Sequence, residues 1–133
     1  MIVRARRPNL AVMDLDPQQY AEQWVADWNA GDLESVLAHY ADDVVFRSPV
    51  AARVVPDSGG IIVGKAALAD YWRTALSQVT DLHFTLDAVY SSVNALTICY
   101  RNQRGQPVAE SLVLGDDGLV RFGMGAYGPD PTS

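Results

Sequence analysis

The stretch "WNAGDLESVLAHYADDVVFRSP", residues 28–49, changes from helical to extended character halfway along its length. Gly31 can adopt the left-handed conformation that ends a helix, and Asp32 directly after it can cap the next helix. The second half contains a Val-Val-Phe run and closes with Ser48–Pro49. This order predicts two helices broken at Gly31, followed by a strand over residues 43–48.

A further helix is expected before the break, from Asp16 to about Ala30. Asp16 is suited to the N-cap, a proline follows at the first helical position, and Gln19 can return a hydrogen bond to the cap. Three large aromatic residues recur along this helix at four-residue spacing: Tyr20, Trp24 and Trp28. They share one face, and an aromatic face at helical spacing is typical of a protein core.

Two more helices complete the expected helical part. The short second helix has apolar residues on one side, at Leu33, Val36, Leu37 and Tyr40. Residues 50–63 contain a proline and a Gly-Gly pair, which predicts an irregular, flexible rim. The third helix is expected after Gly64, over residues 65–79, where apolar residues recur at helical spacing.

The hydrophobic period then falls from about 3.6 to about 2 residues, which indicates strands. The expected strands cover residues 82–88, 94–103, 106–114 and 119–127, and the last three are joined by tight turns. Helices followed by an antiparallel meander predict an α+β fold. In this fold, three N-terminal helices pack on one face of a curved, mainly antiparallel sheet.

The composition indicates one ordinary globular domain, because 49% of the 133 residues are hydrophobic and only 20% are charged. The formal charge of -6 argues against nucleic acid and against an anionic membrane surface as partners, since both favour clustered lysine and arginine. A neutral or cationic small ligand fits this charge better. Residues 1–14 are expected to form a flexible extension and residues 129–133 a disordered tail.

Cys99 is the only cysteine, so an internal disulfide is impossible and the cytoplasm is the expected location. No apolar run reaches the roughly 18 residues of a membrane span. The two histidines, His39 and His83, have no carboxylate at ligand spacing on a shared helix face, so the sequence predicts no metal site and no cofactor. Ser48 would need an adjacent base to act as a nucleophile, and neither histidine is expected beside it.

Glu110 is the strongest candidate for chemistry, because it alternates with Val108, Leu112 and Leu114 on an apolar strand face. A turn centred on Asp116–Asp117 places it opposite Gly123, with Arg121 as a diagonal neighbour. Two interpretations follow: Glu110 lines a pocket next to small glycines, or it is a structural ion-pair partner of Arg121.

The sequence leaves two pairings, one residue apart, for the two strands joined by Arg104–Gly105. A slip of one residue would exchange Cys99 for Tyr100 as the inward neighbour of Glu110. We favour Tyr100 and Asn102 as the inward residues. The outward face then carries six residues that are mostly apolar: Ala109, Ser111, Val113, Val120, Phe122 and Met124. An apolar outer face predicts a homodimer formed through the sheet.

Three blocks of sequence, in this order, resemble the nuclear transport factor 2-like superfamily, which includes ketosteroid isomerases and SnoaL-like polyketide cyclases. The blocks are "WNAGDLESVLAHYADDVVF", "GKAALADYWRTAL" and "ESLVLGDDGLVRFGMGAY", and the resemblance covers about residues 16–127. It implies a cone-shaped fold, here assigned to residues 15–128, with a pocket at its open end. It also implies that the strand before Pro49 delivers a polar side chain to that pocket.

Compared with ketosteroid isomerases, the chain keeps only part of the catalytic set. The resemblance places Ser48 where those enzymes hold their aspartate base, and Glu110 where they hold a protonated acid that donates to the substrate oxygen. Trp24 and Trp72 take the places of two tyrosines, and Tyr40 matches a third. Because the base is missing, steroid isomerisation by the usual route is not expected.

These observations give one candidate catalytic residue, Glu110, and a candidate ligand-binding set: Trp24, Tyr40, Ser48, Trp72, Tyr100, Arg121 and Tyr127. The first functional hypothesis is an apolar pocket that binds a small, mostly hydrophobic metabolite without catalysis. The second is a cofactor-independent lyase, isomerase or cyclase that uses Glu110 as acid or base. An accessory role in a larger complex is the remaining alternative.

Overall fold

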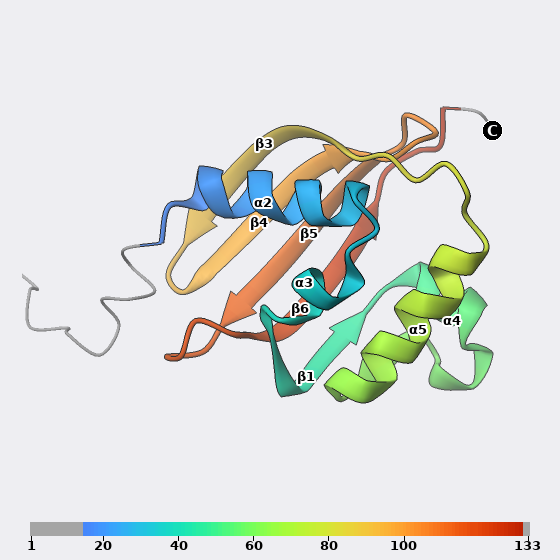
Figure 1. The fold of residues 1–133 in the computed structure, drawn as a ribbon, viewed down its shortest axis with the longest axis horizontal. Helices are drawn as coiled ribbons and strands as arrows, with labels where there is room; N and C mark the ends of the chain where they lie inside the picture. The colour runs from blue at the N-terminus through green and yellow to red at the C-terminus, as the bar shows by residue number, and fades with distance from the viewer. Residues whose placement is uncertain (1–14, 132–133) are drawn as a thin grey trace, which may run out of the picture.

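A computed structural model describes residues 15–131 of the chain. The expected extension, residues 1–14, lies outside the described part, and so do residues 132–133 of the expected tail. Helices come first and an antiparallel meander follows (Figure 1), so the predicted α+β class is confirmed.

The helices begin and end close to their sequence signals. They are α2 (Pro17–Asn29), α3 (Leu33–Leu37), α4 (Pro49–Val54), the 3-10 helix η2 (Pro56–Ser58) and α5 (Lys65–Ser77). Asp16 caps α2 by accepting from two backbone N–H groups, and Asp32 caps α3 by accepting from Ser35. Gly31 lies between the two helices at a φ of 70°, the left-handed conformation that favours glycine.

The stretch 50–63 was expected to be irregular, and this expectation is wrong. It contains α4, η2 and the short strand β2 (Ile61–Val63). Ser48 is the N-cap of α4, since its side chain accepts from the Val50 N–H, and Pro49 is at the first helical position. This is the same polar-residue-then-proline signal that starts α2.

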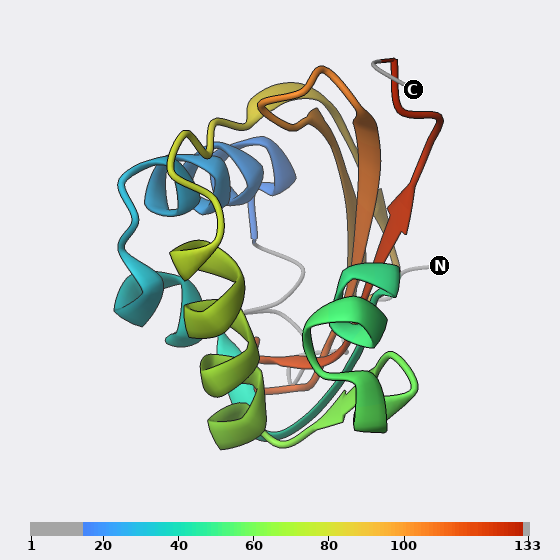
Figure 2. The same ribbon diagram turned by 90° about the vertical axis from the view of Figure 1, so that its right-hand side faces the viewer.

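Six strands form one curved sheet in the order β2-β1-β6-β5-β4-β3. Besides β2, they are β1 (Tyr40–Arg47), β3 (Thr85–Ser92), β4 (Ala95–Arg101), β5 (Pro107–Leu114) and β6 (Val120–Tyr127). β1 pairs parallel with β6, and the other pairs are antiparallel. Figure 2 shows α2, α3 and α5 on one side of this sheet.

The strand register differs from the expected one in the last hairpin. Glu110 lies opposite Gly125 and not Gly123. The hairpin closes on Leu114 and Val120, one residue later than expected, and a bulge between Val113 and Leu114 adds the second residue. The pairing therefore shifts by two residues, which leaves Glu110 on the inner face. Val120, expected on the outer face, is buried, since it pairs with the inward Leu114.

The register through Arg104–Gly105 places Tyr100 inward, as favoured. Tyr100 pairs with Val108 and is 3% exposed, while Cys99 lies on the outer face beside Ala109. The strand expected over residues 82–88 lies further along the chain, since β3 begins at Thr85 and ends at Ser92. The Asn29 side chain instead holds the Phe84 backbone, donating to its carbonyl oxygen at 2.9 Å and accepting from its N–H at 2.7 Å.

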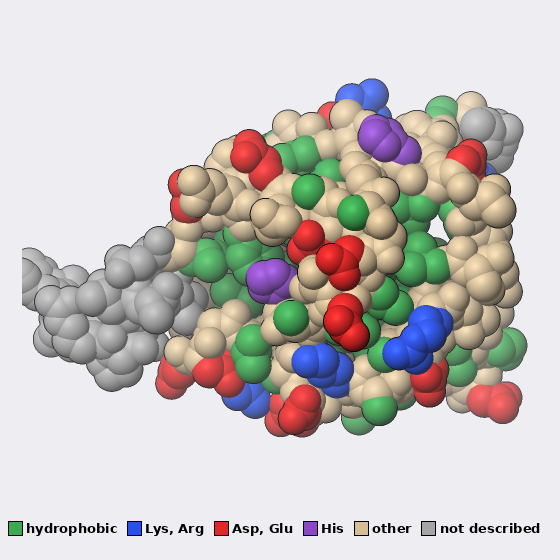
Figure 3. All heavy atoms as spheres, in the orientation of Figure 1, with side chains coloured by type: hydrophobic (Ala, Val, Ile, Leu, Met, Phe, Trp, Pro, Cys, Tyr) green, Lys and Arg blue, Asp and Glu red, His purple; other side chains and the backbone are tan. Residues whose placement is uncertain are grey.

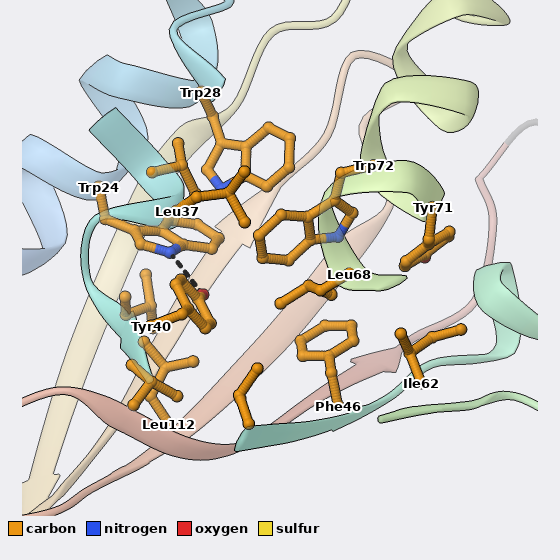
Figure 4. Close-up of a cluster of buried hydrophobic side chains, with 14 of the residues drawn as sticks. Trp24, Trp28, Leu37, Tyr40, Phe46, Ile62, Leu68, Tyr71, Trp72 and Leu112 are labelled. Atoms are coloured by element: carbon orange, nitrogen blue, oxygen red, sulfur yellow. Dashed lines mark hydrogen bonds between the residues drawn. The ribbon is translucent and has the colours of Figure 1, made fainter. Parts of the chain in front are cut away.

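Aromatic side chains fill the space between the helices and the sheet (Figure 4). Trp24 of α2 is 2% exposed, and its indole N–H donates to the Tyr40 hydroxyl at 3.3 Å. Trp72 of α5 packs edge-on against Trp28, with ring centres 5.0 Å apart. The aromatic face of the first helix is therefore part of the core.

Candidate functional site

A cavity of about 140 Å³ remains where the aromatic core meets the open end of the sheet. Its walls come from α2, α5 and the inner face of β1, β4, β5 and β6, and the connection between α5 and β3 forms part of its rim. Hydrophobic side chains are visible in the hollow beside this connection (Figure 3). Eight of the lining residues are aromatic: Trp24, Trp28, Phe46, Tyr71, Trp72, Phe84, Tyr100 and Tyr127.

Glu110 projects from the middle of β5 into this cavity and is 4% exposed. The absence of a side chain at Gly125 makes room for it, because a Cβ there would lie 3.3 Å from the Glu110 Oε1 atom. Gly123 was also expected to leave space, but Phe46 fills that space, with its Cδ1 atom 2.7 Å from where a Cβ would stand. Of these two glycines, therefore, only Gly125 leaves space for the Glu110 side chain.

The Glu110 carboxyl has an unusual protonation state. Burial raises its pKa from 4.5 to about 8, and the hydrogen bond from Tyr100 opposes this rise. The Tyr100 hydroxyl lies 3.5 Å from Oε1, a long contact, which agrees with burial being the larger effect. At neutral pH the carboxyl is therefore mostly protonated and can donate a hydrogen bond.

Tyrosine hydroxyls surround the carboxyl and stay neutral over the same pH range. Burial raises the pKa of Tyr71 to about 12, and hydrogen bonding to Ser48 opposes that rise. Burial, followed by the field of Glu110, raises the pKa of Tyr100 and of Tyr127 well above the ordinary value of 10. The polar end of the cavity thus carries one titrating group between pH 5 and pH 9.

Two residues of the predicted ligand-binding set lie outside the cavity wall. Arg121 donates to Asp43 and to Asp117, both at 3.1 Å, at the far end of β6. It is not near Glu110, because the bulge shifts the hairpin register, and the interpretation of Glu110 as its ion-pair partner is therefore excluded. Tyr40 lies behind Trp24, fully buried, where it accepts the indole hydrogen bond.

The other predicted residues come together around one space. The cavity wall contains Glu110, Trp24, Ser48, Trp72, Tyr100 and Tyr127. Ser48 has no histidine beside it, since His39 packs against Tyr20 with ring centres 5.3 Å apart. Its hydroxyl is used to cap α4, so Ser48 is not arranged as a nucleophile.

Sequence reasoning missed four of the aromatic wall residues: Trp28, Phe46, Tyr71 and Phe84. Tyr71 belongs to the predicted helix over residues 65–79, where the helical spacing of apolar residues indicated packing alone, although a buried tyrosine needs a polar partner for its hydroxyl. Phe84 was assigned to a regular strand. Its position depends on the side chain of Asn29, which is 55 residues away in the sequence, and no local pattern reveals such a contact.

Within residues 15–131, no group of three or more histidine, cysteine, aspartate or glutamate side chains is arranged to hold a metal ion. In the same part of the chain, no helix is long and apolar enough to cross a membrane.

Residues 21–126 match the model of the SnoaL-like domain, so the chain belongs to this family. The predicted resemblance to the nuclear transport factor 2-like superfamily is thereby confirmed. A SnoaL-like protein of unknown function from Burkholderia thailandensis is 34% identical, with 85% of this chain and 94% of that chain covered and a TM-score of 0.80.

More distant structures share the fold alone. An NTF2-like protein of unknown function from Burkholderia pseudomallei is 14% identical, with 86% of this chain and 92% of that chain covered and a TM-score of 0.68. An NTF2-like protein of unknown function from Cytophaga hutchinsonii is 10% identical, with coverage of 89% and 95% and a TM-score of 0.64. Among curated proteins, no sequence matches this chain significantly.

The raised pKa of Glu110 predicts how stability depends on pH. The folded protein binds the Glu110 proton more tightly than the unfolded chain does. The contribution of this proton to the free energy of unfolding is therefore fully present below about pH 4.5, and it is lost as pH rises towards about 8. Each unit in this window should remove roughly 1.4 kcal/mol from the free energy of unfolding. Urea denaturation between pH 5 and pH 9 should show this decline in the parent and not in Glu110→Gln.

Glu22→Gln is the matched control, because it removes the same charge from an exposed position on α2. It should keep the decline of the parent protein. If Glu110→Gln and the parent followed parallel curves over this range, the Glu110 carboxyl would not be buried in its protonated form.

Proposed function

We propose that this SnoaL-like domain binds a small, mostly hydrophobic molecule in the cavity beside Glu110. One observation carries the proposal: a cavity lined by eight aromatic residues also contains a buried carboxyl, and the hydrogen bond that this carboxyl accepts from Tyr100 is long, at 3.5 Å. A buried polar group with incomplete hydrogen bonding costs free energy. A ligand that approaches the carboxyl would recover part of that cost.

The size of the cavity limits the ligand. A cavity near 150 Å³ in another protein accommodates benzene, whereas drug-sized ligands occupy roughly 300 to 1,000 Å³. The 140 Å³ cavity therefore suits a molecule of about one ring, and a steroid does not fit it.

The second candidate function is a cofactor-independent lyase, isomerase or cyclase. It is favoured by the pKa of about 8 at Glu110, because a carboxyl that titrates near neutral pH can both give and accept a proton. We rank it second, since the cavity wall offers no second group that titrates near neutral pH, and Ser48 stands where the relatives hold a base. Turnover that disappears in Glu110→Gln would reverse this ranking.

The proposed partner of the chain is a second copy of itself. Four large apolar side chains are exposed on the sheet face opposite the helices: Tyr90, Val113, Phe122 and Met124. Such a patch is typical of an interface. The charge of -6 disfavours nucleic acid and anionic membranes as partners, and the single Cys99 is compatible with the proposed cytoplasmic location.

Blocking the cavity tests the proposed binding. Toluene should bind the parent protein, perturb the NMR signals of Trp72 and Phe84, and raise the melting temperature. Ala75→Phe places a ring in the cavity and should abolish these effects, because Ala75 is part of the wall. Thr74→Phe adds the same ring at the neighbouring exposed position and should bind like the parent. Equal binding by both variants, or none by the parent, would contradict the proposal.

The homodimer has a separate test. Light scattering at micromolar concentration should give twice the chain mass of 14.5 kDa. Phe122→Asp places a charge on the exposed sheet face and should give a monomer, whereas Ala66→Asp, on the exposed side of α5, should remain dimeric. A monomeric parent would remove the proposed interface.

A further inference from the structure

The Glu110 carboxyl has no basic partner in the described chain. The cavity wall contains no lysine, arginine or histidine. Arg121 is engaged by Asp43 and Asp117, and Arg53 is exposed on α4. Buried carboxylates in proteins are normally paired with a cation or bind a metal. A bound molecule could therefore provide the positive charge beside Glu110.

The remaining wall also favours a positive charge. The faces of aromatic rings carry negative potential and attract cations, most strongly in tryptophan. Trp24, Trp28 and Trp72 all belong to this wall, and Tyr100 lies between Trp24 and Glu110, with its ring centre 5.5 Å from that of Trp24. The protonated Glu110 carboxyl and the tyrosine hydroxyls can also donate to a neutral acceptor, but such a ligand would make no use of the negative faces of the three tryptophan rings.

We propose that the cavity binds a small organic cation, a methylated ammonium ion, with its charge against the Glu110 carboxylate and its methyl groups against the aromatic rings. This inference rests on the proposed function and names the class of ligand. Methylation is favoured because a primary ammonium brings three N–H donors, whereas the side-chain oxygens of Ser48 and Asn102 in the wall already accept from backbone N–H groups. The methyl groups need no acceptor.

Binding of such a cation should depend on pH, because Glu110 must lose its proton. Tyr71, Tyr100 and Tyr127 line the cavity with Glu110, and Tyr40 lies behind Trp24 within reach of the field of Glu110. The pKa values of these four hydroxyls are all raised above 10, so they stay neutral from pH 6 to pH 9. Arg53 on α4 lowers the pKa values of Tyr71 and Tyr127, an effect smaller than that of their burial. Glu110 is therefore the group in the cavity that changes charge in this range.

Choline and its uncharged isostere 3,3-dimethylbutan-1-ol form a matched pair of probes. Each has about seven heavy atoms, close in size to benzene, so each suits the cavity. Calorimetric titration should show choline affinity rising roughly tenfold per pH unit from pH 6 to pH 8 and levelling above it. At pH 7, binding should release about one proton per choline, measured by comparing buffers of different ionisation enthalpy. The alcohol should bind without this rise.

Variants separate the carboxylate from other titrating groups. Glu110→Gln should weaken choline binding at least tenfold at pH 8.5 and keep the binding of 3,3-dimethylbutan-1-ol. Glu22→Gln removes an exposed charge of the same sign, and His83→Gln removes a histidine between the rim residues Leu82 and Phe84. Both controls should bind choline like the parent.

The outcomes distinguish this inference from the proposed function. Choline binding that is absent, independent of pH or unaffected by Glu110→Gln would overturn the inference, while toluene binding blocked by Ala75→Phe would keep the pocket. If neither choline, the alcohol nor toluene binds, both proposals fail.

Discussion

The packing of Trp24 between the helical layer and the sheet is the contact on which the rest of the domain depends. Its ring stacks on Phe84, packs against Tyr100 and meets Trp28 edge-on, and its N–H is satisfied by Tyr40. These contacts join α2 to β1, β4 and the residue before β3. They fill the inner end of the space under the helices, and the cavity begins where they stop.

The cavity combines two features that each have a structural cause. Gly125 leaves the space in which the Glu110 side chain lies, since a larger residue would meet its Oε1 atom. The aromatic wall excludes water from the carboxyl, and this burial raises its pKa. The Glu110 carboxyl is therefore mostly protonated at pH 7, and the proposed cation would favour its deprotonated form. Burying an ionisable carboxyl costs free energy, and this cost supports the ligand-binding proposal.

Local signals predicted the fold class and much of the cavity wall. Gly31 and Asp32 predict the break between the first two helices. The alternation around Glu110 predicts that it lies on the inner face of β5, and this holds whether it pairs with Gly123, as expected, or with Gly125, as observed. The start of α4 was missed although Ser48–Pro49 repeats the signal of Asp16–Pro17, because the following glycines pointed to a loop. Arg121 was placed beside Glu110 because a bulge leaves no clear mark in a sequence. The clamp of Asn29 on Phe84 is a long-range contact, and local patterns cannot reveal it.

The central claim is that the Glu110 carboxyl is buried, unpaired and neutral at pH 7. Carbon NMR titration of the side-chain carboxyl in the native protein measures this directly, with Glu110→Gln assigning the signal. A midpoint near pH 8 is predicted for the Glu110 carboxyl. A midpoint at or below about 4.5 would contradict the account, because it would show a solvated or ion-paired carboxylate.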